Sequence, residues 1–192
     1  MRIIAGEYRG RSLSTVRDRS IRPTTDRAKQ TMFDILTNRI AFEGIRVLDL
    51  FAGSGSLGLE ALSRGALEVV FVEQARTSLA VLTKNIAGLQ CESRSTVHQA
   101  DVFWFLKQTR RPFDLVFVDP PYNLETIGTL PSALYNSAAT QEGTYVVMEH
   151  SRESAIDLSA SMYDAIRKQF GQTVALILCT KQKTSPRPPA TE

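Results

Sequence analysis

Short apolar runs alternate along the chain with segments whose apolar residues recur at helical spacing. Strands are expected at 45–51, 67–74, 95–101, 113–121 and 143–151, and at two runs that flank a turn at Gly171 between residues 163 and 181. Helices are expected at about 24–40, 56–65, 75–87, 103–109 and, with a weaker pattern, 124–138. Strands that alternate with helices are typical of a parallel sheet with helices on both faces. The pattern therefore predicts an α/β fold with a mostly parallel seven-stranded sheet and an antiparallel last strand.

The patterning divides the chain into three parts. Residues 1–22 contain glycines and a weak alternation, which predicts a small basic β-hairpin arm followed by a polar connector. Residues 23–180 carry the alternating strands and helices and form the main domain. Residues 181–192 lack large apolar side chains that could pack, so we expect a disordered tail.

Composition limits the class of protein. The 192 residues are 43% hydrophobic and 22% charged, which suits a globular chain with one main core. No apolar run approaches the ~20 residues needed to span a bilayer, and the N-terminus lacks the pattern of a signal peptide. Cys91 and Cys179 lie far apart without metal-ligand spacing. We therefore expect a cytoplasmic protein with reduced thiols, no metal site and no membrane partner.

Positive charge is concentrated near the N-terminus. The net charge is +3, but residues 1–29 hold eight Lys and Arg and three acids, so that segment carries +5 and the remaining residues −2. A basic arm on a near-neutral body indicates a polyanionic partner such as nucleic acid. The alternative is a basic loop that only faces solvent.

Acidic residues follow the first three strands of the sheet, where ligands bind in folds of this class. Asp49 precedes a glycine-rich turn, Gly-Ser-Gly-Ser-Leu-Gly at 53–58, while Glu73 ends the second strand and Asp101 the third. Glycines let a ligand approach the backbone closely, and an acid at the position of Glu73 suits ribose hydroxyls. The turn also fits the fingerprint of a dinucleotide site, and an acid such as Asp101 can simply cap the next helix.

The charge of Asp49 distinguishes the two cofactors. An acid beside the turn repels a pyrophosphate, but it attracts a ligand that carries an ammonium and a sulfonium group. Asp101 stands where a carboxylate can accept a hydrogen bond from an adenine amino group. We therefore predict that S-adenosylmethionine, rather than a dinucleotide, binds at this edge.

The fourth strand ends in Asp119-Pro120-Pro121-Tyr122. Each proline removes a backbone N–H, so this stretch offers carbonyl acceptors beside an acidic acceptor side chain. Converging acceptors suit an exocyclic amine, which has two N–H groups to donate, and Tyr122 offers a flat face for stacking of a base. A Pro-Pro turn alone would also end a strand. The acid and the ring beside a cofactor site favour a clamp for a nucleobase amine that faces the methyl donor.

These motifs resemble those of the amino-methylating class I methyltransferases, which share a Rossmann-like fold and a [D/N]-P-P-[Y/F] motif. Within that class the chain resembles the RsmD family, bacterial guanine-N2 methyltransferases of 16S ribosomal RNA, over about residues 1–180. The resemblance rests on RIIAGEYRGR, RPTTDRAKQTMFDIL, LDLFAGSGSLGLEALSRGA, FVEQAR and FVDPPY. It implies S-adenosylmethionine as the donor and an assembled or partly assembled small ribosomal subunit as the partner. We expect the enzyme to be a monomer.

Residue roles follow from the resemblance by position. The guanine would be held by Asp119, Pro120, Pro121 and Tyr122. The donor would be bound by Arg22, Pro23, Thr24, Asp49, Phe51, Ala52, Gly53, Ser54, Gly55, Ser56, Glu73, Gln74, Asp101 and Val102. RNA would be contacted by the basic arm and, just after it, by Arg27; the residues are Arg2, Arg9, Arg11, Arg17, Arg19 and Arg27. The chain departs from the family at Ala75, where an acid is common, which argues against a donor contact from that position.

Two other functions fit part of the pattern. An adenine-N6 methyltransferase of DNA uses the same clamp, but such enzymes usually carry a separate domain that contacts the groove, and only a short arm remains here. A non-catalytic RNA-binding assembly factor would not need an intact donor site. His98 and His150 are expected to satisfy local hydrogen bonds, with His150 the better placed for catalysis near a strand end. Trp104 is expected in the core or against the adenine.

Overall fold

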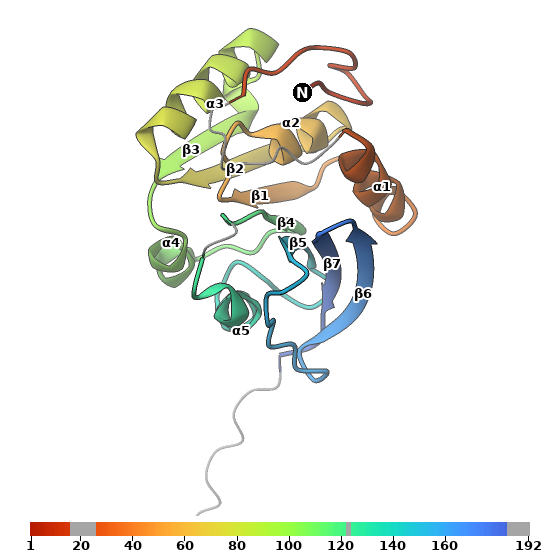
Figure 1. Cartoon of the computed structure of the whole chain (residues 1–192). Coiled ribbons are helices and arrows are strands. Elements are labelled where there is room, and N and C mark those ends of the chain that lie inside the picture. The colour runs from red at the N-terminus through yellow and green to blue at the C-terminus, as the bar shows by residue number, and fades with distance from the viewer. Residues whose placement is uncertain (16–25, 122–123, 184–192) are drawn as a thin grey trace, which may run out of the picture.

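The structure of the chain, a computed structural model, describes residues 1–15, 26–121 and 124–183 (Figure 1). The strands are β1 (Arg46–Leu50), β2 (Glu68–Glu73), β3 (Ser95–Gln99), β4 (Leu115–Val118), β5 (Tyr145–Ser151), β6 (Tyr163–Phe170) and β7 (Thr173–Thr180). The α-helices are α1 (Asp26–Thr37), α2 (Ser56–Ser63), α3 (Arg76–Leu89), α4 (Val102–Gln108) and α5 (Leu130–Asn136). Each strand lies inside a range that the sequence predicts.

The seven described strands form one sheet in the order β3-β2-β1-β4-β5-β7-β6. Strands β1 to β5 pair in parallel, and β7 pairs antiparallel with both β5 and β6. The predicted mostly parallel sheet with an antiparallel last strand is therefore confirmed. The order reverses between β1 and β4, which is the position at which open α/β sheets bind ligands.

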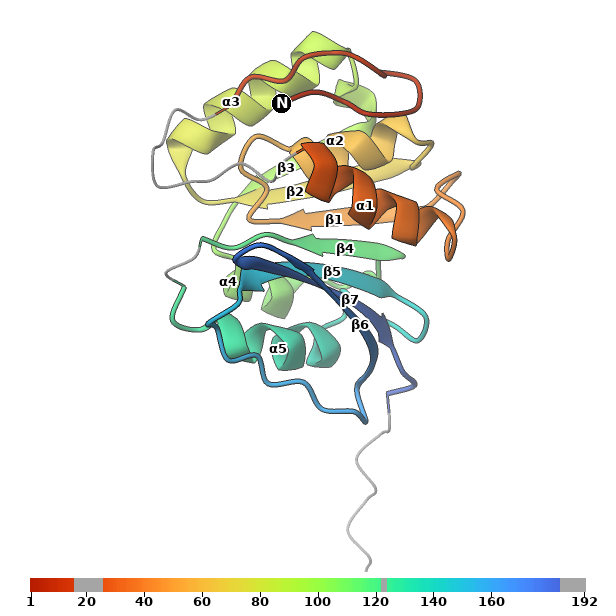
Figure 2. The same ribbon diagram turned by 45° about the vertical axis from the view of Figure 1, so that its right-hand side comes forward.

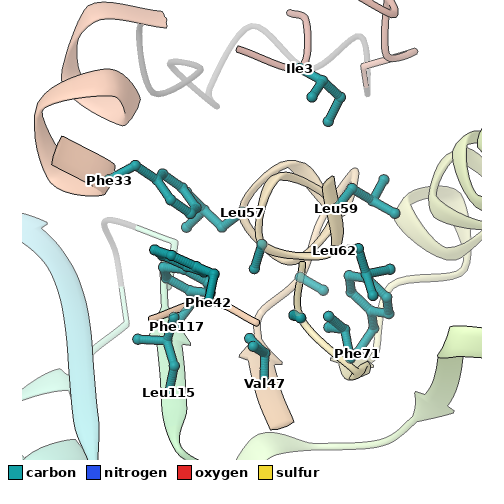
Figure 3. Packing of buried hydrophobic residues seen from close by; sticks show 14 of the residues in the cluster. Ile3, Phe33, Phe42, Val47, Leu57, Leu59, Leu62, Phe71, Leu115 and Phe117 are labelled. Atoms are coloured by element: carbon teal, nitrogen blue, oxygen red, sulfur yellow. The ribbon is translucent and has the colours of Figure 1, made fainter. Parts of the chain in front are cut away.

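Helices cover both faces of the sheet, as Figure 2 shows. On the face of α1, α2 and α3, a buried apolar cluster includes Phe33, Leu62 and Phe71 (Figure 3). On the face of α4 and α5, a second cluster includes Leu106 and Leu134. The central strands β1, β2 and β4 are buried on both sides, which explains their continuous apolar runs.

The N-terminal segment, residues 1–15, doubles back on itself and packs over α2 and α3 (Figure 2). Its two halves form an antiparallel bridge between Arg2 and Ser12 in place of two regular strands. Backbone hydrogen bonds from Ile3 to Arg11, from Gly10 to Ile3 and from Leu13 to Met1 also join the halves. The side chains of Ile3 and Leu13 are buried in the first apolar cluster. This part of the predicted arm therefore shares the main core.

The residues just after β7 are hydrogen-bonded to the main domain. The backbone N–H of Lys181 donates to the carbonyl of Met162 at 2.9 Å, and the ammonium of Lys183 donates to the carbonyl of Ser137 at 2.7 Å. The first three residues of the expected tail thus lie against the domain, and residues 184–192 lie outside the described residues.

Helix α1 ends earlier than its apolar pattern predicts. It stops at Thr37, because the N–H groups of Arg39 and Ile40 both donate to the carbonyl of Leu36 in a closing turn. Its expected start at about residue 24 lies outside the described residues. Within the described ranges, no helix has the length and apolar character needed to cross a membrane.

Candidate functional site

The carboxyl ends of β1 to β4 lie side by side along one edge of the sheet. Leu50, the last residue of β1, is in register with Val72 of β2 and Val118 of β4, and Glu73 is in register with Gln99 of β3. Residues at or just after these strand ends therefore share this edge. They include the four acids that the sequence places there, Asp49, Glu73, Asp101 and Asp119.

Asp49 is buried beneath α2. Its Oδ2 accepts a hydrogen bond from the backbone N–H of Gly58 at 2.9 Å. Burial raises the pKa of Asp49 well above its usual range, and the negative charges of Asp119 and Glu73 raise it further. The edge of the sheet therefore brings together acidic groups that disfavour one another's ionisation before any ligand binds.

Two glycines of the glycine-rich turn have different structural roles. Gly53 has a φ of 55°, in the left-handed region, and Phe51 adopts a φ of 56° despite its side chain. A Cβ on Gly53 would meet only the Phe51 carbonyl oxygen at 3.9 Å, so the turn is open at this position. A Cβ on Gly58 would lie 2.4 Å from Phe71 and 2.9 Å from the carboxylate of Asp49. Gly58 thus allows α2 to lie close to the sheet.

Gly58→Ala is expected to destabilise the protein by about 1–3 kcal/mol, because the added methyl group overpacks the contact between α2 and the sheet. Chemical denaturation measures the free energy of unfolding. The matched control is Gly88→Ala in α3, where a Cβ would meet no atom within 4 Å. The control is expected to be neutral or slightly stabilising. A Gly58→Ala protein within about 0.5 kcal/mol of the unaltered one would contradict the tight packing.

Glu73 holds the turn from the end of β2. Its Oε2 accepts the N–H of Gly53 at 2.9 Å, and its Oε1 accepts the N–H of Ala75 at 2.8 Å. The residue is half-buried. Each carboxylate oxygen has a further lone pair, so Glu73 can accept from two hydroxyl groups while it fixes the turn.

Asp101 caps helix α4. Its Oδ1 accepts the N–H of Trp104 at 2.9 Å, so the capping alternative is realised, and the residue remains exposed. Trp104 itself is 57% exposed, so the expectation of a core position for it is wrong. The buried face of α4 is formed instead by Val102 and Phe105, with Leu106 beside them.

The remaining residues predicted to bind the donor differ in exposure. Ala52 and Val102 are buried, whereas Gln74 is exposed. The carbonyl of Ser54 accepts a hydrogen bond from the side-chain amide of Asn85 in α3 at 2.9 Å. The turn is therefore fixed from α3 as well as from β2.

Asp119 begins the stretch that follows β4. The residue as a whole is accessible to solvent, and Pro120 beside it is buried. Neighbouring atoms nevertheless desolvate the Asp119 carboxyl group, which raises the pKa of Asp119 to about 6. The carbonyl of Pro121 accepts the N–H of Leu124 at 3.0 Å. This hydrogen bond occupies part of the accepting capacity of the Pro121 carbonyl, which favours the Pro120 carbonyl as the acceptor expected beside Asp119. Tyr122 lies outside the described residues.

The arginines expected to contact RNA have different surroundings. Arg2, Arg9 and Arg27 line a cavity of about 380 Å³ between the N-terminal segment and α1. The guanidinium of Arg11 donates to the carbonyl of Gly88 in α3 at 2.5 Å, so this side chain also joins the segment to the domain. The predicted residues Arg17, Arg19, Arg22, Pro23 and Thr24 lie outside the described residues.

His150 has a feature that the sequence does not reveal. It is buried at the end of β5, and its Nδ1 lies 2.7 Å from the carbonyl oxygen of Ser151, which meets the expectation of a local hydrogen bond. Its Nε2 is buried without a hydrogen-bond partner among the described residues. Burial lowers the pKa of His150, so the neutral ring is favoured. The sequence signal for this residue is only its place near a strand end.

The residues at the edge suit a cationic nucleoside. Asp49, Glu73 and Asp119 repel one another electrostatically, so a cation gains from their field and a pyrophosphate would add to the repulsion. The open turn at Gly53 and the exposed carboxylate of Asp101 leave room and acceptors for sugar and base. In the described part of the chain, no cluster of three or more His, Cys, Asp or Glu could hold a metal ion.

Comparison with known sequences shows that the chain matches one family model and resembles relatives over most of their length. The family model described as conserved hypothetical protein 95 matches residues 1–179. The "Putative rRNA methyltransferase YlbH" of Bacillus subtilis (strain 168) is 34% identical over 179 residues, covering 90% of this chain and 95% of the relative. The "Ribosomal RNA small subunit methyltransferase D" of Escherichia coli (strain K12) is 32% identical over 182 residues, covering 95% of this chain and 90% of the relative.

Solved structures share the fold. The "Putative methyltransferase yhhF from Escherichia coli" superposes with a TM-score of 0.84 at 31% identity, covering 95% of this chain and 99% of that chain. A putative methylase from Haemophilus influenzae superposes with a TM-score of 0.78 at 32% identity, covering 94% of this chain and 98% of that chain. The class I methyltransferase architecture expected from the sequence is therefore confirmed.

Proposed function

Because the chain belongs to the family described as conserved hypothetical protein 95, the RsmD family, we propose that it is an S-adenosylmethionine-dependent methyltransferase that modifies the N2 amine of one guanine in 16S ribosomal RNA. Its substrate is the small ribosomal subunit, on which it acts as a monomer in the cytoplasm. The main support for this proposal is that Glu73, Asp101 and Asp119 lie along one edge of the sheet, beside an open turn. The name of the relative from Escherichia coli supports the choice of RNA.

The donor binds along the edge from β3 to β1. Glu73 accepts from the ribose hydroxyls with lone pairs that its two backbone donors leave unused, and Asp101 accepts from the adenine amino group with the oxygen that does not cap α4. S-adenosylmethionine supplies an activated methyl group on a positively charged sulfur. A cation favours ionised carboxylates, so donor binding lowers the pKa of Asp49 and of Asp119. Binding is therefore accompanied by release of protons.

The acceptor amine is held by the stretch after β4. The carboxylate of Asp119 and the carbonyl of Pro120 each accept one N–H of the guanine amine. Accepting both hydrogen bonds localises electron density on the nitrogen and aligns its lone pair with the methyl group. As the N–CH₃ bond forms, the sulfur–methyl bond would break and the sulfur would leave as a neutral thioether. The methylated nitrogen would then lose a proton to Asp119 or to water. The stacking of the base on Tyr122 remains a prediction from the sequence.

Transfer of labelled methyl groups to three acceptors tests the proposal. The purified protein is given labelled S-adenosylmethionine with unmethylated small subunits, with naked 16S ribosomal RNA, or with duplex DNA. We expect label in the small subunits. Label in DNA alone would keep the clamp but identify a DNA enzyme. Donor binding without transfer to any of the three would point to a non-catalytic factor and contradict the proposal.

A further inference from the structure

A charged cluster is buried beneath the N-terminal segment, away from the acids of the sheet edge. Lys29 of α1 and Glu60 of α2 are 1% and 0% exposed in their side chains, and the ammonium nitrogen lies 3.2 Å from a carboxylate oxygen. Arg64, the residue that follows α2, donates from Nε to the same carboxylate at 2.9 Å. Burial lowers the pKa of Lys29, and the charge of Glu60 opposes that shift. Buried charges are costly to remove from water, so they persist only where their geometry is well matched.

Glu60 fastens the N-terminal segment to α2. Its two carboxylate oxygens accept the backbone N–H groups of Ile4 at 2.8 Å and Ala5 at 3.0 Å. With the two cations, the carboxylate therefore has four donors from three parts of the chain. This arrangement alone would explain a purely structural role for the cluster.

Lys29 makes hydrogen bonds to two parts of the chain besides its contact with Glu60. Its ammonium also donates to the backbone carbonyl of Arg2 at 2.8 Å and to the hydroxyl of Ser56 at 3.3 Å. An ammonium has three N–H donors, and here each has an acceptor. Ser56 is the first residue of α2 and closes the glycine-rich turn, whereas Arg2 belongs to the N-terminal segment. One side chain thus connects the turn with the segment expected to contact RNA.

We propose that Lys29 is a positioning residue for the methyl donor, which sets the glycine-rich turn by holding Ser56 against the N-terminal segment. The inference rests on the proposed function, because it requires that the donor bind at this turn. Through the same contact, displacement of the N-terminal segment by RNA changes the affinity for the donor. By linkage, the donor changes the affinity for RNA by the same factor.

The comparison of Lys29→Met with Arg64→Met separates positioning from stability. Both variants remove a cation from Glu60, and both are expected to unfold more easily than the unaltered protein. Only the first removes the donor to Ser56 and Arg2. Calorimetric titration with S-adenosylmethionine is expected to show about tenfold weaker binding for Lys29→Met. Arg64→Met is expected to bind within about twofold of the unaltered protein.

A double-mutant cycle with Ser56→Ala tests whether Lys29 affects donor binding through the hydroxyl of Ser56. If Lys29 acts through this hydroxyl, the loss in Lys29→Met/Ser56→Ala is smaller than the product of the two single losses. Losses that multiply would show that Lys29 does not act through the Ser56 hydroxyl. Equal donor affinities of Lys29→Met and Arg64→Met would overturn the positioning role of Lys29 while leaving the proposed function intact. An unaltered protein that binds no donor would overturn both. Should Lys29→Met fail to fold, Lys29→Arg replaces it, because the planar guanidinium keeps the charge but not the three-way geometry.

Discussion

Asp119→Asn is expected to slow methyl transfer to small subunits by about 10²–10³-fold, which is typical for loss of one preorganised electrostatic contact to the reacting group. Asparagine keeps the shape, but its amide replaces one acceptor oxygen with a donor and removes the negative charge. The affinity for S-adenosylmethionine is expected to change much less, because the donor relies on Glu73 and Asp101. Single-turnover transfer with labelled donor measures the chemical step, and calorimetry measures binding.

The control for this variant is Asp114→Asn, at the opposite end of β4, where the carboxylate accepts the backbone N–H of Arg46 at 2.8 Å. The control is expected to retain the turnover of the unaltered protein. Transfer by Asp119→Asn at more than about a tenth of the unaltered rate would remove Asp119 from the acceptor clamp.

The same carboxylate predicts how activity and stability depend on pH. The pKa of Asp119 is raised by burial from 3.8 to about 6 in the folded protein. The protonated form is therefore favoured by folding, and the stabilising contribution is fully present below pH 4 and is lost as the pH rises through about 6. Catalysis requires the ionised acceptor, so kcat/KM rises over the same interval. Asp119→Asn is accordingly expected to unfold at a higher temperature than the unaltered protein at pH 7 despite its lost activity.

Glu73→Gln is expected to weaken donor binding by about 10–100-fold, the range for loss of hydrogen bonds to a charged acceptor. In the unaltered protein both oxygens accept backbone N–H groups, from Gly53 and Ala75. An amide nitrogen in place of one oxygen would face one of these N–H groups, and the turn would have to shift. The ribose hydroxyls lose the same acceptor.

The matched control is Glu68→Gln at the other end of β2, where the carboxylate pairs with Arg46 at 3.3 Å and Arg111 at 2.9 Å. Because these arginines are half exposed, the control is expected to change stability little and donor affinity not at all. Calorimetric titration decides between the two positions. A Glu73→Gln protein that binds the donor as tightly as Glu68→Gln does would remove Glu73 from the donor site.

The strands and the acidic edge are predictable from the sequence for a physical reason. Strands buried on both faces, such as β1 and β4, leave continuous apolar runs that end where the chain reaches the sheet edge. A polar residue directly after such a run must lie at that edge, which is why Glu73 and Asp119 could be placed together. The structural role of Gly58 is less apparent from the sequence, since its spacing fits a nucleotide fingerprint whereas its surroundings in the structure show close packing of α2.

Local patterns do not determine which polar residues become buried. Lys29 and Glu60 are charged residues of a kind that usually faces solvent, and they are buried where α1, α2 and the N-terminal segment meet. The burial of Ile3 has the same tertiary origin. The core position expected for Trp104 is wrong because α4 carries five apolar residues in succession, from Val102 to Leu106, which leaves the buried face of the helix undefined in the sequence.

The most direct test of the central claim is the chemical identity of the methylated nucleoside. Small subunits that lack the modification are incubated with the protein and S-adenosylmethionine, the RNA is digested to nucleosides, and the products are identified by mass spectrometry against standards. We expect N2-methylguanosine, formed by the unaltered protein and by Asp114→Asn and formed about 10²–10³-fold more slowly by Asp119→Asn. A methyl group on a ring nitrogen of guanine, on adenine or on ribose would contradict the amine clamp at Asp119 and Pro120.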